Sequence, residues 1–311
     1  AQTTLVSDTL HYNTGTGIAH IVGPSNIEHG SSHIYSELGY YDSKANLSYL
    51  LNRSILTNEG KRLVGDSVVW DGEHKVGKAF GNIVYTDAAN KNMFTGNYCL
   101  YNDSTGYSEA ADSAVAIDFS QKDTLYAHAD TFKVFTYNIR TDSVYRVMHA
   151  YRHMRAYRRD IQAVCDSLVF NGQDSVMTMY HDPILWQEGQ QLLGEEIKAF
   201  FKDGDLRQVD VIGNVRLGYF PQDGKDSTLI GYVTAEASLM NVYLQQRKVQ
   251  KIKLTTQTDG VMYPMLQIPS DKLYLPSFAW FDYIRPLNKD DIFHWRGKKA
   301  GQELKKSIQR E

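Results

Sequence analysis

Apolar and polar residues alternate with a period of two in a stretch that recurs along the chain. In the clearest copy, Leu63 to Asp71, Asp66 is followed by Val68 and Trp70 two and four positions later. In a strand this period buries one face, whereas in a helix these positions would fall on different faces. The pattern therefore predicts a repeat built from β-strands.

One acid or amide marks the start of each alternating stretch, and we call these residues anchors. They are Asp8, Glu37, Asp66, Asn97, Asp130, Asp166, Glu195 and Glu236. Most gaps are about 30 residues, the period expected of repeat arrays, and the last gap is 41 residues. We expect the anchors at the entrances of strands, where their side chains bond backbone N–H groups in turns.

The positions that follow the anchors supply the candidate inner face. Four positions after each anchor the residue is always apolar or aromatic: Tyr12, Tyr41, Trp70, Tyr101, Val134, Phe170, Ala199 and Met240. Two positions after, the set includes Leu10, Val68, Phe132, Leu168 and Ile197. Two facing sheets would make this face a plain core if they touch. If they splay, the face could hold acyl chains, at roughly 0.8 kcal/mol per buried methylene. Periodicity does not choose between these alternatives, and physics alone favours the core.

An arginine-rich stretch, Tyr145 to Arg159, has spacing that partly fits a helix. However, Ala150 to Met154 resembles Ala79 to Ile83 of the clearest copy, which favours a strand after a longer turn. The arginines then form either a solvated strand face or a basic rim that meets phosphate groups through bidentate guanidinium contacts.

The periodicity stops after Pro264. The stretch from Leu273 to Pro286 is rich in aromatic residues and bounded by prolines. It predicts a cap on the last strand edge of the array, because repeat stacks need capped ends; the alternative is a docking segment for a partner. We therefore expect a repeat domain over residues 1–263, followed by an aromatic segment and a charged tail over 264–311.

Composition narrows the function classes. The 311 residues carry a net charge of −3 with a pI near 6.4, which gives no electrostatic case for nucleic-acid binding. No apolar run approaches 18 residues, so we expect membrane contact only through partners. The chain starts at Ala1 without a leader, which fits either a mature protein whose signal peptide has been removed or an edited start; we expect the former, in a periplasmic protein. Strand parity turns Cys99 and Cys165 to opposite faces and argues against a disulfide.

The sequence carries no recognisable catalytic or cofactor motif. Phosphate-binding loops, zinc-protease helices, Cys-x-x-Cys pairs and nucleophile elbows are all absent from it. The histidine pairs His29/His33 and His149/His153 lack a third ligand by spacing and are interpreted as surface residues. Because the anchor carboxylates recur regularly, they do not suggest one special catalytic pair. We expect no enzyme activity, no metal and no cofactor.

Several short motifs, taken in order, resemble the OstA-like family of periplasmic lipopolysaccharide-transport proteins. They include Leu63 to Ser67 with Gly81 to Val84, and Leu192 to Glu195 with Gly213 to Val215. The stretches Asp160 to Leu168, Pro183 to Trp186 and Pro276 to Pro286 are similar to large members of this family from Bacteroidetes-type bacteria. The resemblance covers about residues 5–296.

This resemblance implies an all-β fold, a twisted, V-shaped β-jellyroll of two sheets. It also implies a periplasmic protein that shields the acyl chains of lipopolysaccharide, or of its lipid A part, in an apolar groove. Neighbouring jellyroll proteins would pair with its open strand edges. The groove residues would be those of the candidate inner face. The main alternative is a structural β-solenoid that binds protein partners and carries no lipid, and a polysaccharide-active enzyme is the least favoured.

Overall fold

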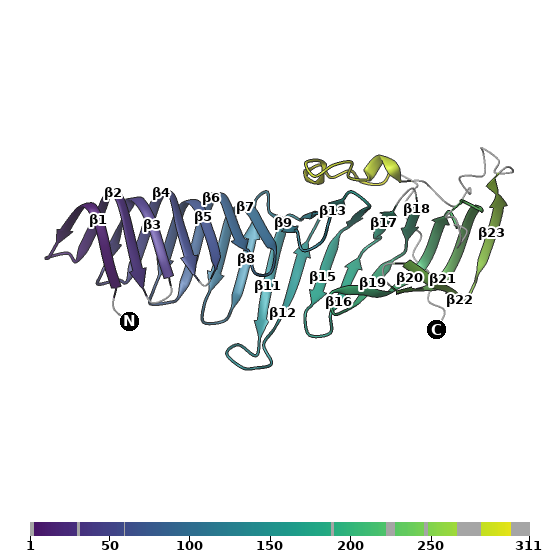
Figure 1. Cartoon of the computed structure of the whole chain (residues 1–311), viewed down its shortest axis with the longest axis horizontal. Coiled ribbons are helices and arrows are strands. Elements are labelled where there is room, and N and C mark those ends of the chain that lie inside the picture. Colours follow the sequence, from purple (N-terminus) through teal and green to yellow (C-terminus); the bar gives the residue numbers. More distant parts are fainter. Residues whose placement is uncertain are drawn as a thin grey trace. The chain divides into compact units, whose positions relative to one another are not determined.

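The structure is a computed structural model that describes residues 3–29, 32–58, 60–187, 190–221, 228–245, 248–265 and 281–299. In these ranges the regular structure consists of 23 strands and short 3₁₀ turns, and the strand pairs described below are antiparallel. This confirms the all-β fold predicted from the period of two. Figure 1 shows the strands following one another in chain order.

The chain divides into two compact units, Ala1–Ala150 and Tyr151–Glu311, which we call unit 1 and unit 2. The strands that begin in unit 1 are β1 (Thr3–Asn13), β2 (Ile18–His29), β3 (Ser32–Asp42), β4 (Leu47–Asn58), β5 (Lys61–Asp71), β6 (Val76–Asp87), β7 (Asn92–Asn102), β8 (Tyr107–Ala111), β9 (Val115–Asp118), β10 (Leu125–His128), β11 (Thr131–Tyr137) and β12 (Tyr145–Tyr151).

Unit 2 continues the same alternation. Its strands are β13 (Met154–Arg158), β14 (Ile161–Cys165), β15 (Ser167–Asn171), β16 (Val176–Tyr180), β17 (Ile184–Gln187), β18 (Gln190–Leu193), β19 (Glu196–Lys202), β20 (Asp205–Tyr219), β21 (Gly231–Gln245), β22 (Lys248–Thr255) and β23 (Asp259–Pro264). The 3₁₀ turns η2 (Asp282–Ile284) and η3 (Asp291–Phe293) follow.

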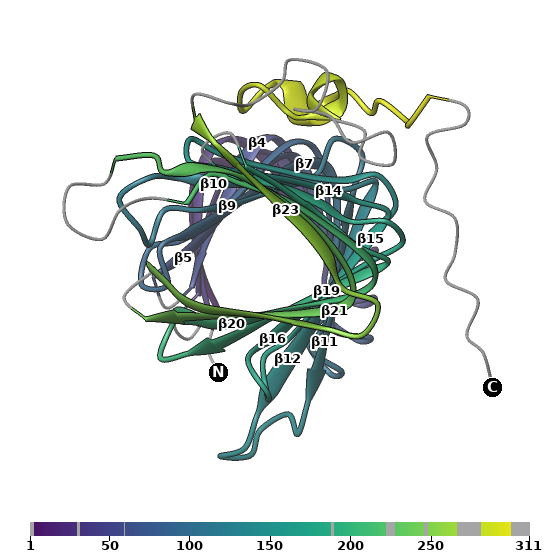
Figure 2. The same ribbon diagram turned by 90° about the vertical axis from the view of Figure 1, so that its right-hand side faces the viewer.

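Each long strand bends at a corner and gives one half to each of two layers. The two halves of β7 show this directly, because Asn92–Thr95 pair with β9 whereas Tyr98–Asn102 pair with β8. In unit 2, the two halves of β21 likewise pair with β23 and β22. The layers are visible in the end-on view of Figure 2. We call the layer of β8 and β22 layer B, and that of β9 and β23 layer A.

The corners explain the repeat. On alternate strands the corner consists of two consecutive residues with positive φ. Residues other than Gly, Asn and Asp rarely adopt this backbone conformation. These pairs are Asn52/Arg53, Gly81/Asn82, Asp112/Ser113, Arg152/His153, His181/Asp182, Gly213/Asn214 and Thr256/Gln257. The arginine-rich stretch is therefore a pair of strands, β12 and β13, separated by such a corner, and the strand prediction is confirmed.

The core of unit 1 lies between the layers, next to the corners. Ile21, Leu50, Val68, Ala79 and Ile83 are buried together. Small residues fill the corner itself, where the layers converge. Fully buried Ser54, for example, donates its hydroxyl to the Ser36 hydroxyl at 2.9 Å, so a narrow space is filled without an unsatisfied polar group.

The prediction that the anchors lie at strand entrances is wrong for five of them: Asp8, Glu37, Asp66, Asn97 and Glu236 lie inside β1, β3, β5, β7 and β21. Asp130, Asp166 and Glu195 directly precede β11, β15 and β19, as predicted. Asp66 lies at the corner of β5, where the ladder to β6 shifts between Val64 and Ser67. Glu236, the last anchor, was also misplaced. The corner of β21 is Ser238, whose N–H donates to the Thr256 carbonyl. Glu236 lies two residues before this corner and faces Arg216.

The C-terminal segment does not cap the last strand edge in the part that the structure describes. Phe281 and Ile284 instead pack on β14, β17 and β18, and residues 273–280 and 300–311 of the predicted segment and tail lie outside the described residues. The predicted boundary after Tyr263 stays a prediction. In the described ranges no helix has the length and apolarity needed to cross a membrane.

Candidate functional site

The candidate site is the face of layer B in unit 1 that looks toward layer A. Cross-strand register arranges this face into two rows that run from β1 to β11. The row nearer the corners, which we call the inner row, is Leu10, Ile21, Gly39, Leu50, Val68, Ala79, Cys99, Ala110 and Phe132. Apart from Leu10 and Cys99, all of it is buried, so this row is core.

The second row, which we call the aromatic row, lies one pleat farther from the corners. It is Tyr12, Ala19, Tyr41, Ser48, Trp70, Gly77, Tyr101, Ser108 and Val134. Large and small residues alternate because the odd strands supply the rings and the even strands the small side chains. At Gly77 a Cβ would lie 3.2 Å from the Trp70 ring, so the indole occupies space that the glycine leaves free.

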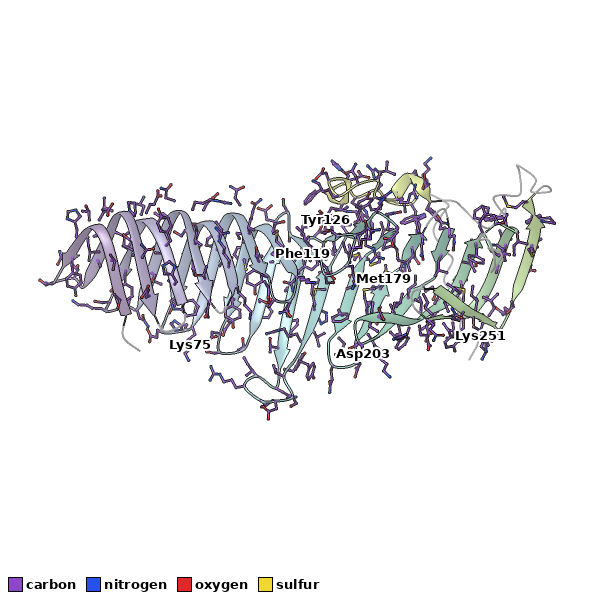
Figure 3. The ribbon with its side chains drawn as sticks, in the orientation of Figure 1. Lys75, Phe119, Tyr126, Met179, Asp203 and Lys251 are labelled. Atoms are coloured by element: carbon purple, nitrogen blue, oxygen red, sulfur yellow. The ribbon has the colours of Figure 1, made fainter. Side chains whose placement is uncertain are left out.

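The aromatic row is only partly covered. Tyr12 is 55 % exposed and Tyr101 is 43 % exposed, while Tyr41 and Trp70 are half-buried. Tyr12 also borders a hollow of about 590 Å³ at the β1–β2 turn. Exposed aromatic residues in register across several strands leave an apolar strip open to a ligand. Figure 3 shows the side chains along the strands of this unit.

Polar groups border the aromatic row at the turns. The Tyr41 hydroxyl donates to Asn46 at 3.3 Å, and the Tyr101 hydroxyl donates to Asp103 at 3.2 Å. The pKa of Tyr101 is raised, chiefly by desolvation and further by Asp103. Each ring therefore has an apolar body within the sheet and a polar tip beside a turn, the arrangement that suits an amphiphile.

In unit 2 the predicted residues divide between the two corresponding rows. Leu168, Met179, Ile197, Val211 and Met240 form the inner row, and all are buried. The second row is Phe170, Met177, Ala199, Val209, Val242 and Ile252. Met240 was grouped with Ala199 because its anchor was misplaced by two residues; the row partner on β21 is Val242.

The structure thus brings the predicted residues together in four rows. Leu10, Val68, Phe132, Leu168, Ile197 and Met240 belong to inner rows, and Tyr12, Tyr41, Trp70, Tyr101, Val134, Phe170 and Ala199 to second rows. Sequence reasoning missed the small members Ala19, Ser48, Gly77 and Ser108. Their signal was available, because a strand that returns from a tight turn pairs position by position with the strand before it.

At the corners, anchors bind the left-handed residues of neighbouring strands. The Asn82 side-chain amide donates to Asp66 at 2.6 Å, and Arg53 donates to the other Asp66 oxygen at 3.1 Å. Asn52 donates to Glu37, and Asn214 donates to Glu195. The pKa of Asp66 is lowered, first by Asn82 and then by Arg53. These bonds hold a strained backbone, which is a structural role.

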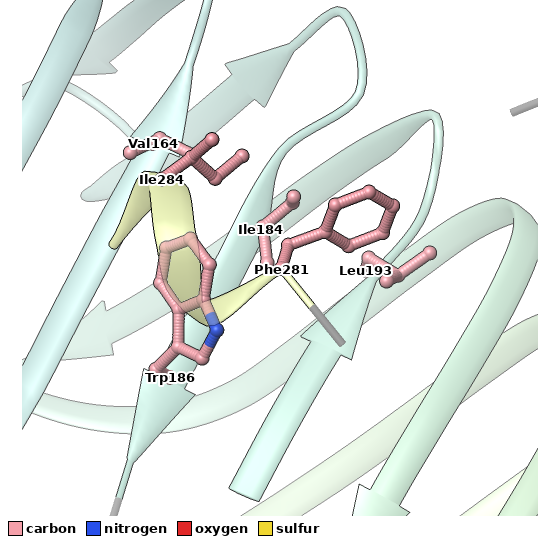
Figure 4. Close-up of a cluster of buried hydrophobic side chains, with 6 residues drawn as sticks. All are labelled: Val164, Ile184, Trp186, Leu193, Phe281 and Ile284. Carbon is pink, nitrogen blue, oxygen red and sulfur yellow. The ribbon is translucent and has the colours of Figure 1, made fainter. Parts of the chain in front are cut away.

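Unit 2 carries a feature that sequence reasoning missed. Val164, Ile184, Trp186 and Leu193 form an apolar cluster on the outer face of layer A, and Phe281 and Ile284 cover it (Figure 4). The fully buried Gln191 carbonyl accepts from the Trp186 indole N–H at 3.0 Å and from the Phe281 N–H at 2.8 Å. We call residues 281–299 the strap.

The two cysteines and the histidines form no chemical site in the described ranges. Both thiols are free, and burial raises the pKa of Cys99 to about 11 and that of Cys165 further. Within the part of the chain that the structure describes, no three His, Cys, Asp or Glu side chains gather as a metal-binding group.

Comparison with solved structures gives a likeness that is weak. No family profile matches the sequence, and no curated protein matches it. The chain is similar to the crystal structure of LptH, described as the LptA homologous periplasmic component of the lipopolysaccharide transport device from Pseudomonas aeruginosa. The identity is 13 %, the match covers 63 % of this chain and 94 % of that chain, and the TM-score is 0.25. A TM-score of this size carries no inference about a ligand.

Proposed function

We propose that this protein is a non-enzymatic, periplasmic carrier that shields the acyl chains of lipopolysaccharide against the inner face of its sheets. The observation that supports this proposal most is the aromatic row, which remains partly open although it continues the buried core. If these residues formed a plain core, the facing sheet would bury them, because exposing aromatic surface to water is unfavourable.

The energetic argument concerns the ligand as much as the protein. Moving an acyl chain out of water is favourable by roughly 0.8 kcal/mol for each methylene that becomes buried. A strip of tyrosine and tryptophan rings offers apolar contact along the sheet, while the hydroxyls of Tyr41 and Tyr101 keep polar partners at the turns. Shielding of this kind needs no catalytic group.

The scaffold alternative places the partner elsewhere. On the opposite face of layer B, Val22, Leu38, Leu51 and Phe80 are exposed and aligned across β2 to β6, with Ser67 between the last two. A protein that only binds partners would use this outer face or a strand edge and would leave the aromatic row empty. The two functions therefore predict contacts on opposite faces of one sheet.

Tyr40 and Tyr41 provide a matched test, because they are adjacent, chemically identical and both half-buried, but on opposite faces of β3. A photoreactive phenylalanine derivative is placed at either position and irradiated with purified lipopolysaccharide. We expect crosslinked lipid at position 41 and at least tenfold less at position 40. Equal labelling at both positions, or none at 41 in a protein with unchanged circular dichroism, would contradict the proposal.

A further inference from the structure

The two units bury corresponding rows to different extents. Apart from Leu10 and Cys99, the inner rows are buried in both units, so both units have a core. The second row is half-buried or exposed at Tyr12, Tyr41, Trp70 and Tyr101 in unit 1. In unit 2 the same row is closed along β19 to β21, where Ala199, Val209 and Val242 are 5 %, 8 % and 9 % exposed.

The facing residues of layer A differ in size between the two units. In unit 1 the register aligns Leu5, Ile27, Ile34, Leu56, Leu63, Tyr85 and Phe94, which are large, and continues to Ala116 and Ala127. In unit 2 the corresponding row is Ala156, Ala163, Leu185, Leu192, Leu217 and Ala235. Bulky side chains between two sheets hold them apart, which accounts for the open part of unit 1 along β1 to β7.

The burial of the layer A residues also differs between the two units. The large residues of unit 1 are half-buried, so they stay partly accessible although they face inward. In unit 2, Ala156, Ala163, Leu217 and Ala235 are buried. Both walls of unit 1 are therefore partly open. In unit 2 the second row is closed along β19 to β21, and Phe170, Met177, Leu185 and Leu192 are half-buried.

We propose that unit 1 alone holds the acyl chains of the carried amphiphile, and that the interior of unit 2 is a closed core. This inference rests on the proposed function and specifies its site. The ligand class is an amphiphile with several saturated chains, which lie along the aromatic row. From β1 to β7 the row crosses six strand spacings, about 29 Å, which is long enough for more than one chain.

The division assigns different roles to residues that the sequence grouped together. Tyr12, Tyr41, Trp70 and Tyr101 contact the ligand. Leu168, Ile197, Ala199 and Met240 stabilise unit 2 and never meet the ligand. The strap fits this division, since it adds a second apolar cluster to unit 2 on the outer face.

The test uses the unaltered chain. Lipid A that carries a diazirine in one acyl chain is bound and irradiated, and labelled peptides are located by tandem mass spectrometry. An excess of unlabelled lipid A identifies the specific label. We expect at least nine-tenths of the specific label on residues 1–150, at the aromatic row and the layer A residues that face it.

The outcomes separate the two proposals. Specific label at Met177, Ala199, Val242 or Ile252, at a level similar to that in unit 1, would overturn the confinement and leave the carrier function standing. No specific label on either unit would overturn both. Label on the outward-facing Tyr40 or Tyr49 without label on Tyr41 would also contradict both, since the lipid would then lie on the opposite face.

Discussion

At the scale of single residues, the corners show how a repeat can be visible while its cause is hidden. Each strand must pass from one layer to the other at a corner. An anchor lies at the corner of one strand, and the neighbouring strand forms its own corner from two residues with positive φ. The anchors recur because these corners recur. Gly81 adopts this conformation freely, whereas Asn82 needs support. Asp66 supplies it by accepting from the Asn82 amide.

Asp66 gives a prediction about pH. Its pKa is lowered from 3.8, so its contribution to stability is present above that pH and is lost as the pH falls through the lower folded-state value. We expect Asp66→Asn to lower the urea midpoint at pH 6 and to have a smaller effect at pH 3, because below 3.8 the carboxyl group of the unfolded chain binds a proton and the stabilising contribution of the charge shrinks.

The measurement is urea unfolding of the wild type and Asp66→Asn at both pH values, monitored by circular dichroism. Glu28→Gln, at an exposed position of β2, serves as control and should leave both midpoints unchanged. An Asp66→Asn effect that is as large at pH 3 as at pH 6 would show that the charge does not support the corner.

At the scale of elements, the strap shows that an outer strand face can become core. In unit 1 the second outer row of layer A is largely polar, with Thr57, Arg62 and Thr86 in register. In unit 2 that row contains Trp186 and Gln191, both fully buried. The strap is held further by the Arg296–Asp291 pair at 2.5 Å and by the Arg155 Nε–H, which donates to the Ile292 carbonyl.

Phe281→Ala tests the strap. Phe281 is 2 % exposed against Ile184, Trp186 and Leu193, and such truncations typically cost about 3–5 kcal/mol. We expect this loss in the unfolding free energy of unit 2 and faster amide hydrogen exchange in β17 and β18. Leu287→Ala, at a side chain that is 61 % exposed, is the matched control and should change the free energy by less than about 0.5 kcal/mol.

Unchanged exchange in β17 and β18 of Phe281→Ala would contradict the packing of the strap on these strands.

At the scale of the whole molecule, strand edges decide how copies or partners could assemble. β1 begins the array of unit 1 and pairs with β2 (Figure 1). We propose that its other edge accepts a strand from a neighbouring jellyroll, as exposed edges commonly do. In an antiparallel ladder, adjacent residues point their N–H groups alternately toward and away from the partner.

Leu5→Pro and Val6→Pro therefore remove N–H groups that point in opposite directions. One variant removes an N–H that points toward β2, and the other removes an N–H that points away from β2. We expect that variant to keep the wild-type melting temperature and to lose concentration-dependent association in sedimentation velocity, while the other loses stability. Association of both variants at the wild-type level would show that the edge of β1 is not used between copies.

The sequence by itself determined the strand content and the large inward-facing residues of layer B in unit 1. These follow from local physics, because the period of two and the left-handed corner residues act within a few positions. The sequence also supported the strands on either side of Arg152, because Arg152 has the place that Gly81 has in the clearest copy. The anchors, by contrast, were assigned to turns, since the sequence shows a recurring acid without showing where the strand bends.

Only the tertiary structure decided which inward-facing positions are open. Trp70 and Val242 have the same place in the pattern, yet one is half-buried and the other buried. The difference depends on packing against residues of other strands, such as Ile34, which precedes Trp70 by 36 positions. The strap is the same kind of case, because Phe281 meets Trp186 across 95 residues of chain. Such contacts depend on the spacing between sheets and on packing at long range, which alternation within one strand does not encode.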